Sequence, residues 1–205
     1  MKKDQFLKSF NNKEITSGIN KAFNNACELI DEAMILENNE KVTRAFTLYQ
    51  LGLEEFGKSI GLFFLLLDRF YDREINYLTY YNDFFRNHIA KTSEVLKSTE
   101  DYLKLIEIMS GYNMNEFINT FKENSISPKK VNTLKNNSLY VDFDSNGFFS
   151  PSIKITKGMV TNINSQCIII KRTFTFLGNL SENKIKIIED YLRIKHSSNN
   201  NTIIN

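Results

Sequence analysis

The sequence predicts an all-α protein, a bundle of five to six helices with one long, partly extended loop. The 205 residues include only two prolines and eight glycines, and so few helix breakers favour long helices over a turn-rich β architecture. Apolar residues recur at helical spacing along most of the chain, as in amphipathic helices. The length and the 41% hydrophobic fraction suit one domain with a real core.

The first half of the chain holds the clearest helical patterns. We expect helices over residues 14–37, 40–70 and 73–97, each with an apolar face. The second of these becomes apolar on all sides at residues 60–67, so it should be the central helix of the bundle. A fourth pattern covers residues 100–121, with a break or bend expected at Gly111.

The pattern then changes at residues 125–152, which we expect to form the long loop. This segment holds both prolines, Pro128 and Pro151. Within it, residues 139–143 alternate like a strand, and residues 144–147 have the composition of a turn. The loop is expected either to be an ordered surface segment or to fold back onto the helices.

Helical spacing resumes over residues 155–177 and again, more briefly, over residues 181–192. The last ten residues are mostly Ser and Asn, a composition typical of disordered termini. The domain prediction is therefore one helical domain over residues 1–195 and a disordered tail over residues 196–205.

Charge and hydropathy bear on where the protein is located and on the partners it could bind. The net charge of +2, from 26 basic and 24 acidic residues, neither demands nor excludes nucleic acid as a partner. No apolar stretch follows the lysines near the N-terminus, so we expect no signal peptide. The longest apolar run, residues 60–67, is far shorter than the ~20 residues that a bilayer span needs. We expect a cytoplasmic protein with no membrane contact.

Cysteine and histidine spacing gives no metal motif. The sequence has no C-x-x-C and no H-E-x-x-H, and Phe85 occupies the position where a Glu-x-x-His motif would need glutamate. Cys27 and Cys167 fall on apolar helical stripes, which predicts small buried side chains rather than a disulfide. We expect no metal and no cofactor.

Charged residues interrupt the central helix where it is becoming apolar. Glu54 and Lys58 are four residues apart, the favourable order for a helical ion pair. Gly52, Gly57 and Gly61 nearby cost helix stability. Glycines among these charges indicate the close approach of another backbone or of a ligand. The alternative is an ordinary solvated or half-buried salt bridge.

His88 is expected on the inner side of the helix at residues 73–97. An imidazole that faces a carboxylate among cations can act as a general acid or base, which would suit metal-independent RNA cleavage through the ribose 2′-hydroxyl. The predicted catalytic residues are His88, Glu54, Lys58 and Lys91. The alternative is a histidine satisfied within the core. Arg86 would point away from His88 on an ideal helix, so a second subunit would have to supply it.

A second group of residues is predicted to bind substrate. Three lysines of the long loop offer phosphate contacts, and we expect Tyr140 and Asp142 to fold back onto the helical site. The predicted substrate-binding residues are Glu55, Arg86, Tyr140, Asp142, Lys129, Lys130 and Lys135.

Three strings carry a family resemblance. Residues 45–58 read A-x-x-L-x-x-L-G-x-E-E-x-G-K, residues 85–91 read F-R-x-H-x-x-K, and residues 138–143 read S-L-Y-V-D-F, with Pro151 downstream. In this order they resemble the AbiV family of abortive-infection (phage-defence) proteins, over about residues 22–180. The matching positions are Glu54, Glu55, Lys58, His88, Lys91, Tyr140 and Asp142.

The resemblance implies a fold related to the HEPN helical bundles, many of which are dimeric ribonucleases of toxin and phage-defence systems. It implies a homodimer and a host-harming effector that stays quiet until infection, when a phage-encoded protein would activate it. The usual HEPN ribonuclease signature is an arginine, four to six residues and a histidine. Arg86 is too close to His88 and Arg73 is too far from it, so the resemblance supports the defence role more than the nuclease mechanism.

Three functional readings follow. The first is an antiphage effector that arrests growth by blocking translation, through an RNA-directed, ribonuclease-like site. The second is a non-enzymatic binding module that occludes a component of the translation machinery. The third is an antitoxin-like regulator without toxicity of its own.

Overall fold

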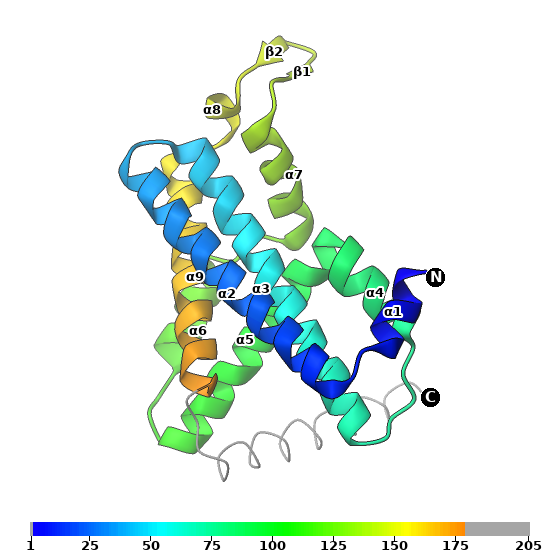
Figure 1. Ribbon diagram of the computed structural model, residues 1–205. Coiled ribbons are helices and arrows are strands. Elements are labelled where there is room, and N and C mark those ends of the chain that lie inside the picture. The colour runs from blue at the N-terminus through cyan, green and yellow to red at the C-terminus, as the bar shows by residue number, and fades with distance from the viewer. Residues whose placement is uncertain (1, 179–205) are drawn as a thin grey trace, which may run out of the picture.

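The computed structural model describes residues 2–178 and is an all-α bundle with one small hairpin (Figure 1). Its helices are α1 (Lys3–Ser9), α2 (Asn12–Asn38), α3 (Val42–Phe70), α4 (Tyr77–Tyr81), the π-helix η1 (Asn82–Arg86), α5 (His88–Ser110), α6 (Asn115–Glu123), α7 (Pro128–Leu139), α8 (Pro151–Lys154) and α9 (Lys157–Gly178). Strands β1 (Asp142–Asp144) and β2 (Gly147–Phe149) pair antiparallel. The all-α prediction is confirmed. The expected helix at residues 181–192 and the expected tail lie outside the described residues.

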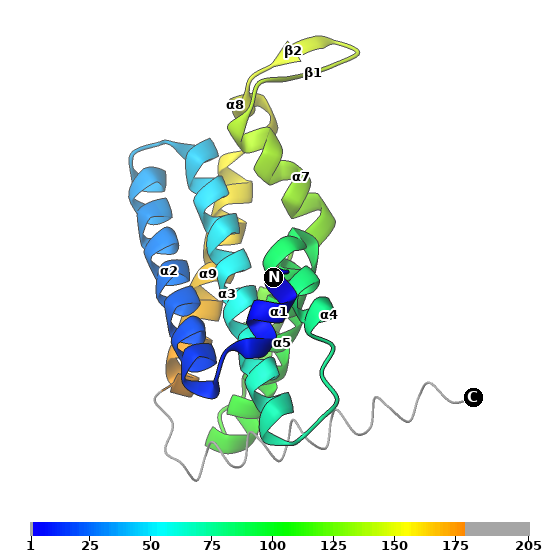
Figure 2. The same cartoon turned by 45° about the vertical axis from the view of Figure 1, so that its right-hand side comes forward.

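The first two long helices form an antiparallel pair (Figure 1, Figure 2). A capping box begins α2: the Asn11 side chain accepts from the Glu14 amide at 3.0 Å, and Glu14 accepts from the Asn11 amide at 2.7 Å. Glu40, with φ of 59°, lies in the turn that reverses the chain into α3. The helices expected over residues 14–37 and 40–70 are therefore present with bounds close to those predicted.

As expected, α3 is the central helix. It contacts α2, α5, α7 and α9, and its Phe46, Tyr49 and Phe56 are almost completely buried. The core continues into α9 through Ile163 and Ile170. Because α3 is surrounded on several sides, polar residues on its inner faces, such as Gln50 and Glu54, lie inside the bundle.

The helix predicted over residues 73–97 is wrong. The chain instead forms α4 and η1, breaks at Asn87, and starts α5 at His88, which continues to Ser110. The Asn87 side chain accepts from the Ala90 amide at 3.1 Å, and such a cap begins a new helix. The break expected at Gly111 is confirmed, since Gly111 has φ of 71° and caps α5.

The long loop predicted over residues 125–152 is also partly wrong, because its first half is α7. Ser127 accepts from the Lys130 amide at 3.4 Å, and Pro128 occupies the first turn. Proline is favoured at the first position of a helix, so Pro128 starts α7 instead of marking a loop. The second half is extended as predicted, with Phe143 opposite Phe148 in the hairpin.

Two other expectations, on the cysteines and on membrane-spanning helices, can be checked in the described residues 2–178. Cys167 is buried and Cys27 is partly buried, and both are free thiols, in agreement with the prediction of packed, unpaired cysteines. Within the same range, every helix is too short or too polar to cross a membrane.

Candidate functional site

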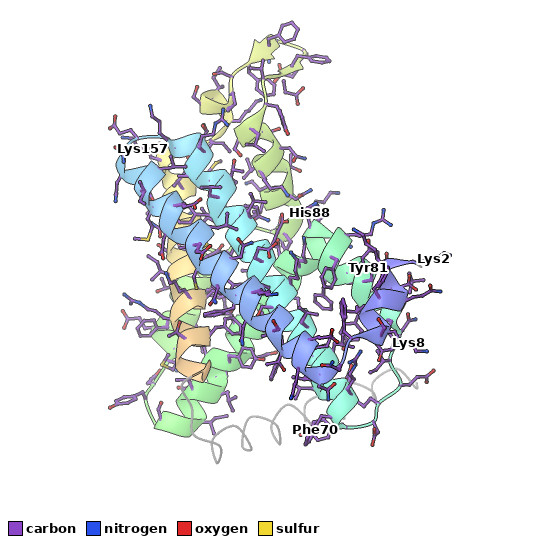
Figure 3. The ribbon with its side chains drawn as sticks, viewed as in Figure 1. Lys2, Lys8, Phe70, Tyr81, His88 and Lys157 are labelled. Atoms are coloured by element: carbon purple, nitrogen blue, oxygen red, sulfur yellow. The ribbon has the colours of Figure 1, made fainter. Side chains whose placement is uncertain are left out.

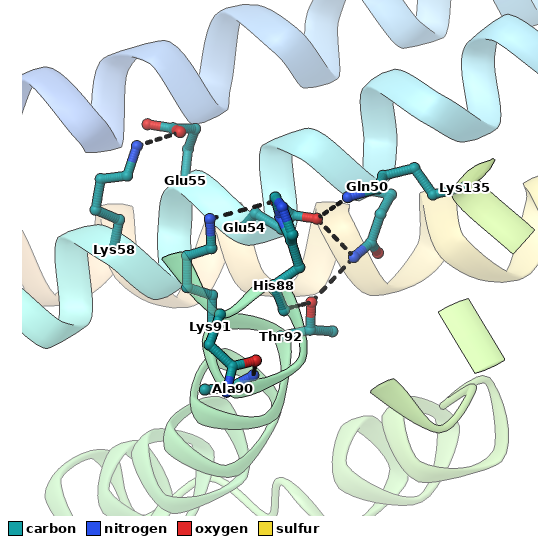
Figure 4. A network of polar contacts seen from close by, with 10 residues as sticks. Gln50, Glu54, Glu55, Lys58, His88, Ala90, Lys91, Thr92 and Lys135 are labelled. Atoms are coloured by element: carbon teal, nitrogen blue, oxygen red, sulfur yellow. Dashed lines mark hydrogen bonds and ion pairs between the residues drawn. The ribbon is translucent and has the colours of Figure 1, made fainter. Parts of the chain in front are cut away.

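Glu54 lies at the centre of a buried polar cluster where α3, α5 and α7 meet (Figure 4). The residue is 2% exposed, yet its carboxylate has four nitrogen neighbours. Lys135 donates to Oε1 at 2.7 Å, and Gln50 Nε2 lies 3.4 Å from the same oxygen. His88 Nδ1 lies 2.5 Å from Oε2, and Lys91 Nζ lies 3.4 Å from it. One carboxylate therefore gathers charge and hydrogen bonds from three helices.

The cluster keeps Glu54 ionised although it is buried. Burial alone would raise the pKa of this carboxyl. Hydrogen bonds from Lys135 and His88, together with the charges of Lys135 and Lys91, outweigh that effect and hold its pKa below the ordinary value. Glu54 is thus a permanent acceptor for the imidazole at neutral pH.

His88 is the first residue of α5, not a residue of an inner helical stripe as predicted. The π-helix η1 ends at Arg86, and the Asn87 amide closes it by donating to the Asn82 carbonyl at 2.8 Å. Single π-turns are frequent at functional sites. About half of the His88 side chain, labelled in Figure 3, is exposed, while its Nδ1 reaches inward to Glu54 (Figure 4). His88 therefore connects the buried carboxylate to the surface.

Two glycines of α3 allow the other segments to come this close. A Cβ added to Gly57 would lie 2.3 Å from the Lys91 carbonyl oxygen, and one added to Gly61 would lie 2.1 Å from the Phe84 ring. Gly52 faces α2 instead, where a Cβ would lie 2.9 Å from the Ile30 side chain. The expectation of close backbone approach is confirmed, and at Gly57 the partner is the backbone of α5.

Lys58 does not pair with Glu54, so that predicted ion pair is wrong. Its Nζ lies 2.5 Å from Glu55 Oε1, three residues away, and 6.0 Å from the centre of the Phe85 ring. Glu54 faces α5 and α7, whereas Glu55 and Lys58 form a mostly buried pair beside the cluster (Figure 4). Lys58 is thus a neighbour of the cluster and not a member of it.

Sequence reasoning missed Gln50 and Thr92. Gln50 is fully buried and donates from Nε2 to Thr92 Oγ1 at 3.0 Å. Thr92 in turn donates to the His88 carbonyl at 3.1 Å. Gln50 stands four residues before Glu54, on the same side of α3, and this spacing is the signal that could have identified it. The two residues tie the start of α5 to the helix that carries Glu54.

The structure does not bring the predicted substrate-binding residues together in one place. Lys135 belongs to the buried cluster, where it bonds Glu54 and is not a surface contact. Lys129 and Lys130 are exposed on the first turn of α7, and Arg86 is exposed at the end of η1. Because the helix breaks at Asn87, the argument that Arg86 and His88 share one ideal helix does not hold.

Tyr140 and Asp142 do not fold back onto the helical site. Both are exposed at the base of the hairpin, which projects from the end of the bundle beyond α7 (Figure 1, Figure 2). The Asp142 carboxylate accepts from the Phe143 amide at 2.9 Å. Their contact with substrate stays a prediction.

The donor set around Glu54 is mainly cationic, with two lysines and an imidazole. Such a set suits an anion more than a metal ion, whose common ligands are carboxylates, thiolates and neutral imidazoles. Across residues 2–178, no three His, Cys, Asp or Glu residues come together in a way that could hold a metal.

Comparison with known proteins gives one match. The family model HEPN_AbiV, described as AbiV, matches residues 14–169, a range that contains Glu54, His88, Lys91 and Lys135. No curated protein and no solved structure matches the chain.

Proposed function

This chain belongs to the AbiV family of HEPN-like proteins, which have an abortive-infection role, and we propose that it arrests growth by an RNA-directed reaction at His88 that blocks translation. The observation that carries the proposal is the contact of Glu54 Oε2 with His88 Nδ1 at 2.5 Å. A buried carboxylate that holds one nitrogen of a half-exposed imidazole is the arrangement that orients a general base.

The pair fixes which imidazole nitrogen reacts. Because Glu54 is ionised, it accepts a hydrogen bond, so Nδ1 carries the proton. In the neutral imidazole, Nε2 is then the nitrogen with a free lone pair, and it can accept a proton from a substrate at the exposed side of His88. Glu54 and His88 together therefore supply a base whose orientation and tautomer are set before substrate arrives.

In the proposed reaction, His88 Nε2 takes the proton of a ribose 2′-hydroxyl. The 2′-oxygen forms a bond to the adjacent phosphorus, and the bond from phosphorus to the 5′-oxygen breaks. The departing 5′-oxygen takes a proton from solvent water. The products are a 2′,3′-cyclic phosphate and a 5′-hydroxyl end.

The two buried lysines have different roles in this proposal. Lys135 is a positioning residue, since its short bond of 2.7 Å to Glu54 holds the carboxylate in place. Lys91 Nζ lies 3.4 Å from Glu54, a longer contact that leaves donors of the ammonium for another anion. Its charge lies beside His88, where it would stabilise the negative charge that develops on a phosphate.

The test is His88→Ala in the full-length protein. We expect it to fold like the wild type by circular dichroism and to lose growth arrest and the cyclic-phosphate ends in sequenced cellular RNA. The matched control is His196→Ala, which changes the chain's other histidine, outside the range of the family match. Full protection against phage by His88→Ala would overturn the catalytic role.

A second candidate, a non-enzymatic binding module, is favoured by the hairpin. Val141, Phe143 and Phe148 are each more than 60% exposed there, and exposed apolar patches mark protein-binding surfaces. A binding module would inhibit cell-free translation in proportion to its concentration, whereas an enzyme would inhibit it at trace amounts. Phe148→Ser would weaken the first kind of inhibition and spare the second.

The homodimer and the phage-encoded activator stay predictions. Light scattering of the purified protein at micromolar concentration tests the first, and a monomer would contradict it. Activation of the RNA reaction on mixing with lysate from infected cells, but not from uninfected cells, tests the second.

A further inference from the structure

A pocket of about 410 Å³ is lined by Glu55 and Phe85, which belong to the same chain segments as the Glu54–His88 pair. It opens between α1, α2, α3 and the end of η1, and its volume falls within the range of small-ligand sites. Buried apolar residues form part of its wall, and polar or aromatic residues form another part. The residues that matter here are Leu7, Ile15, Leu62, Glu55, Lys58 and Phe85.

The pocket and the buried cluster share the same segments of chain. Glu55 lines the pocket and directly follows Glu54 in α3, whereas Phe85 lines it and lies three residues before His88. Figure 4 shows the Glu55–Lys58 pair beside the cluster on α3. A ligand that reached His88 with one group could therefore place a second group in this pocket.

Phe85 gives the pocket a feature that suits a flat ring. Its side chain is partly exposed, with a residue exposure of 37%, and it stacks on Tyr81 with centroids 6.0 Å apart and planes 18° apart. Stacking on Tyr81 holds the Phe85 ring in place at the wall of the pocket. Base-on-aromatic stacking is the main way in which proteins hold the unpaired bases of single-stranded RNA.

The polar residues of the wall complement the edge of such a ring. Glu55 offers carboxylate acceptors, Lys58 offers ammonium donors, and Asn25, also on the wall, offers both. Donors and acceptors around an apolar floor match a nucleobase, which carries both along its edge. Glu55 and Lys58 pair with each other, and each keeps further hydrogen-bonding capacity that a purely aliphatic ligand would not use.

We propose that this pocket binds the base of the nucleotide whose phosphate lies at His88, with Phe85 as the stacking residue. The inference rests on the proposed function and adds a base-binding subsite to it. Glu55, Lys58 and Asn25 contact the edge of the base. The pocket thereby sets which nucleotide is presented to the reacting imidazole.

The test measures binding of two probes to the full-length protein by fluorescence anisotropy. One is a 2′-O-methyl RNA of four nucleotides, which the proposed reaction does not cleave, and the other is an abasic chain with the same phosphates. We expect the wild type to bind the RNA about tenfold more tightly than the abasic chain, the size of one stacking contact. Phe85→Ala should remove this difference and leave binding of the abasic chain unchanged.

Three variants separate stacking from folding. Phe85→Tyr keeps an aromatic ring and should bind RNA like the wild type. Phe85→Leu keeps apolar volume without a ring and should behave like Phe85→Ala. The matched control is Phe117→Ala on α6, which removes another exposed phenylalanine and should change neither affinity.

The outcomes distinguish the inference from the function on which it rests. If Phe85→Ala binds RNA as tightly as the wild type, the subsite is wrong, and binding of the abasic chain with intact cleavage leaves the proposed function standing. If the wild type binds neither probe, the proposed function fails and the subsite fails with it.

Discussion

Lys135 donates a hydrogen bond of 2.7 Å to Glu54 although the two residues are 81 positions apart in the chain. Both are buried, so the bond connects α7 to the centre of α3 inside the bundle. Because Lys91 contacts the same carboxylate, one acid balances two buried ammonium groups. The stability of this part of the fold should therefore depend strongly on Glu54 and less on either lysine alone.

We predict that Glu54→Gln lowers the free energy of unfolding by about 3 to 5 kcal/mol, because it leaves two buried cations without their counter-charge. Lys135→Met should cost less, about 2 kcal/mol, since Lys91 and His88 still contact the carboxylate. Urea denaturation measures both values. Lys130→Met, at an exposed position of the same helix, is the control and should change stability by less than about 0.5 kcal/mol. Equal losses in all three variants would contradict the prediction.

Acid should destabilise the protein through Glu54. Its pKa is lowered in the folded state, so folding favours the ionised form. The resulting stabilisation is complete above the ordinary pKa of a glutamate and is lost as the pH falls from there through the folded pKa. We expect thermal unfolding of the wild type to show a steeper loss of stability on acidification than that of Glu54→Gln.

The control for the acid prediction is Glu100→Gln. Hydrogen bonding from Lys104 also lowers the pKa of Glu100, but this carboxylate is about 30% exposed and solvent screens it. Its replacement should alter the acid dependence only slightly, and added salt should reduce that small effect further. An acid profile of Glu54→Gln that matches the wild type would refute the assignment.

The central helix and the meeting of Glu54 with His88 and Lys91 could be predicted from sequence. Helical period predicts the central helix, and helices near one another in the chain often pack side by side. The period placed His88 incorrectly, however, because the helix expected over residues 73–97 breaks at Asn87. The ion-pair partner of Lys58 could not be predicted, because spacings of three and four residues both bring helical side chains within reach of each other. In the folded protein the Glu54 carboxylate contacts Lys91 and Lys135, whereas Lys58 pairs with Glu55.

The role of Lys135 could not be predicted from sequence for a different reason. Helix α7 was not recognised because it begins with Pro128, and proline is common both in loops and in the first turn of a helix. Without α7, Lys135 appears in a basic surface segment, and nothing local indicates a contact 81 residues away. Long-range packing, not local propensity, decides which of the lysines enters the site.

Asn87 should matter for both stability and the position of His88. Its side chain accepts from the Ala90 amide at 3.1 Å, and loss of such a cap costs about 1 kcal/mol. We predict that Asn87→Ala loses this amount and also lowers the rate of RNA cleavage, because His88 is the first residue of the capped helix. Asn87→Asp keeps an acceptor and should retain most of both properties.

The matched control for the cap is Asn76→Ala. The Asn76 side chain accepts from the Thr79 amide at 3.1 Å, so the same kind of bond is lost at the start of α4. Its stability loss should be similar or smaller, while cleavage should continue at the wild-type rate. Equal effects of the two variants on cleavage would show that the cap at Asn87 has no special relation to His88.

Gly57 is predicted to be the least replaceable glycine of α3. Alanine usually stabilises a helix interior relative to glycine, by up to about 1 kcal/mol. At Gly57 the added Cβ would meet the carbonyl of Lys91 at 2.3 Å, and a backbone carbonyl within a helix cannot turn aside. Gly57→Ala should therefore push α5 away from α3, at a net cost of about 1 to 3 kcal/mol, and should separate His88 from Glu54.

The comparison with Gly18→Ala separates this clash from helix propensity. A Cβ on Gly18 meets only the end of the Leu62 side chain, at 3.2 Å, and that side chain can shift. Gly18→Ala should be neutral or slightly stabilising in urea denaturation, whereas Gly57→Ala should be destabilising. If Gly57→Ala were stabilising too, α3 and α5 would not cross as closely as described. Packing would then give no reason for a glycine at position 57, and the contact between His88 and Glu54 would lose its structural basis.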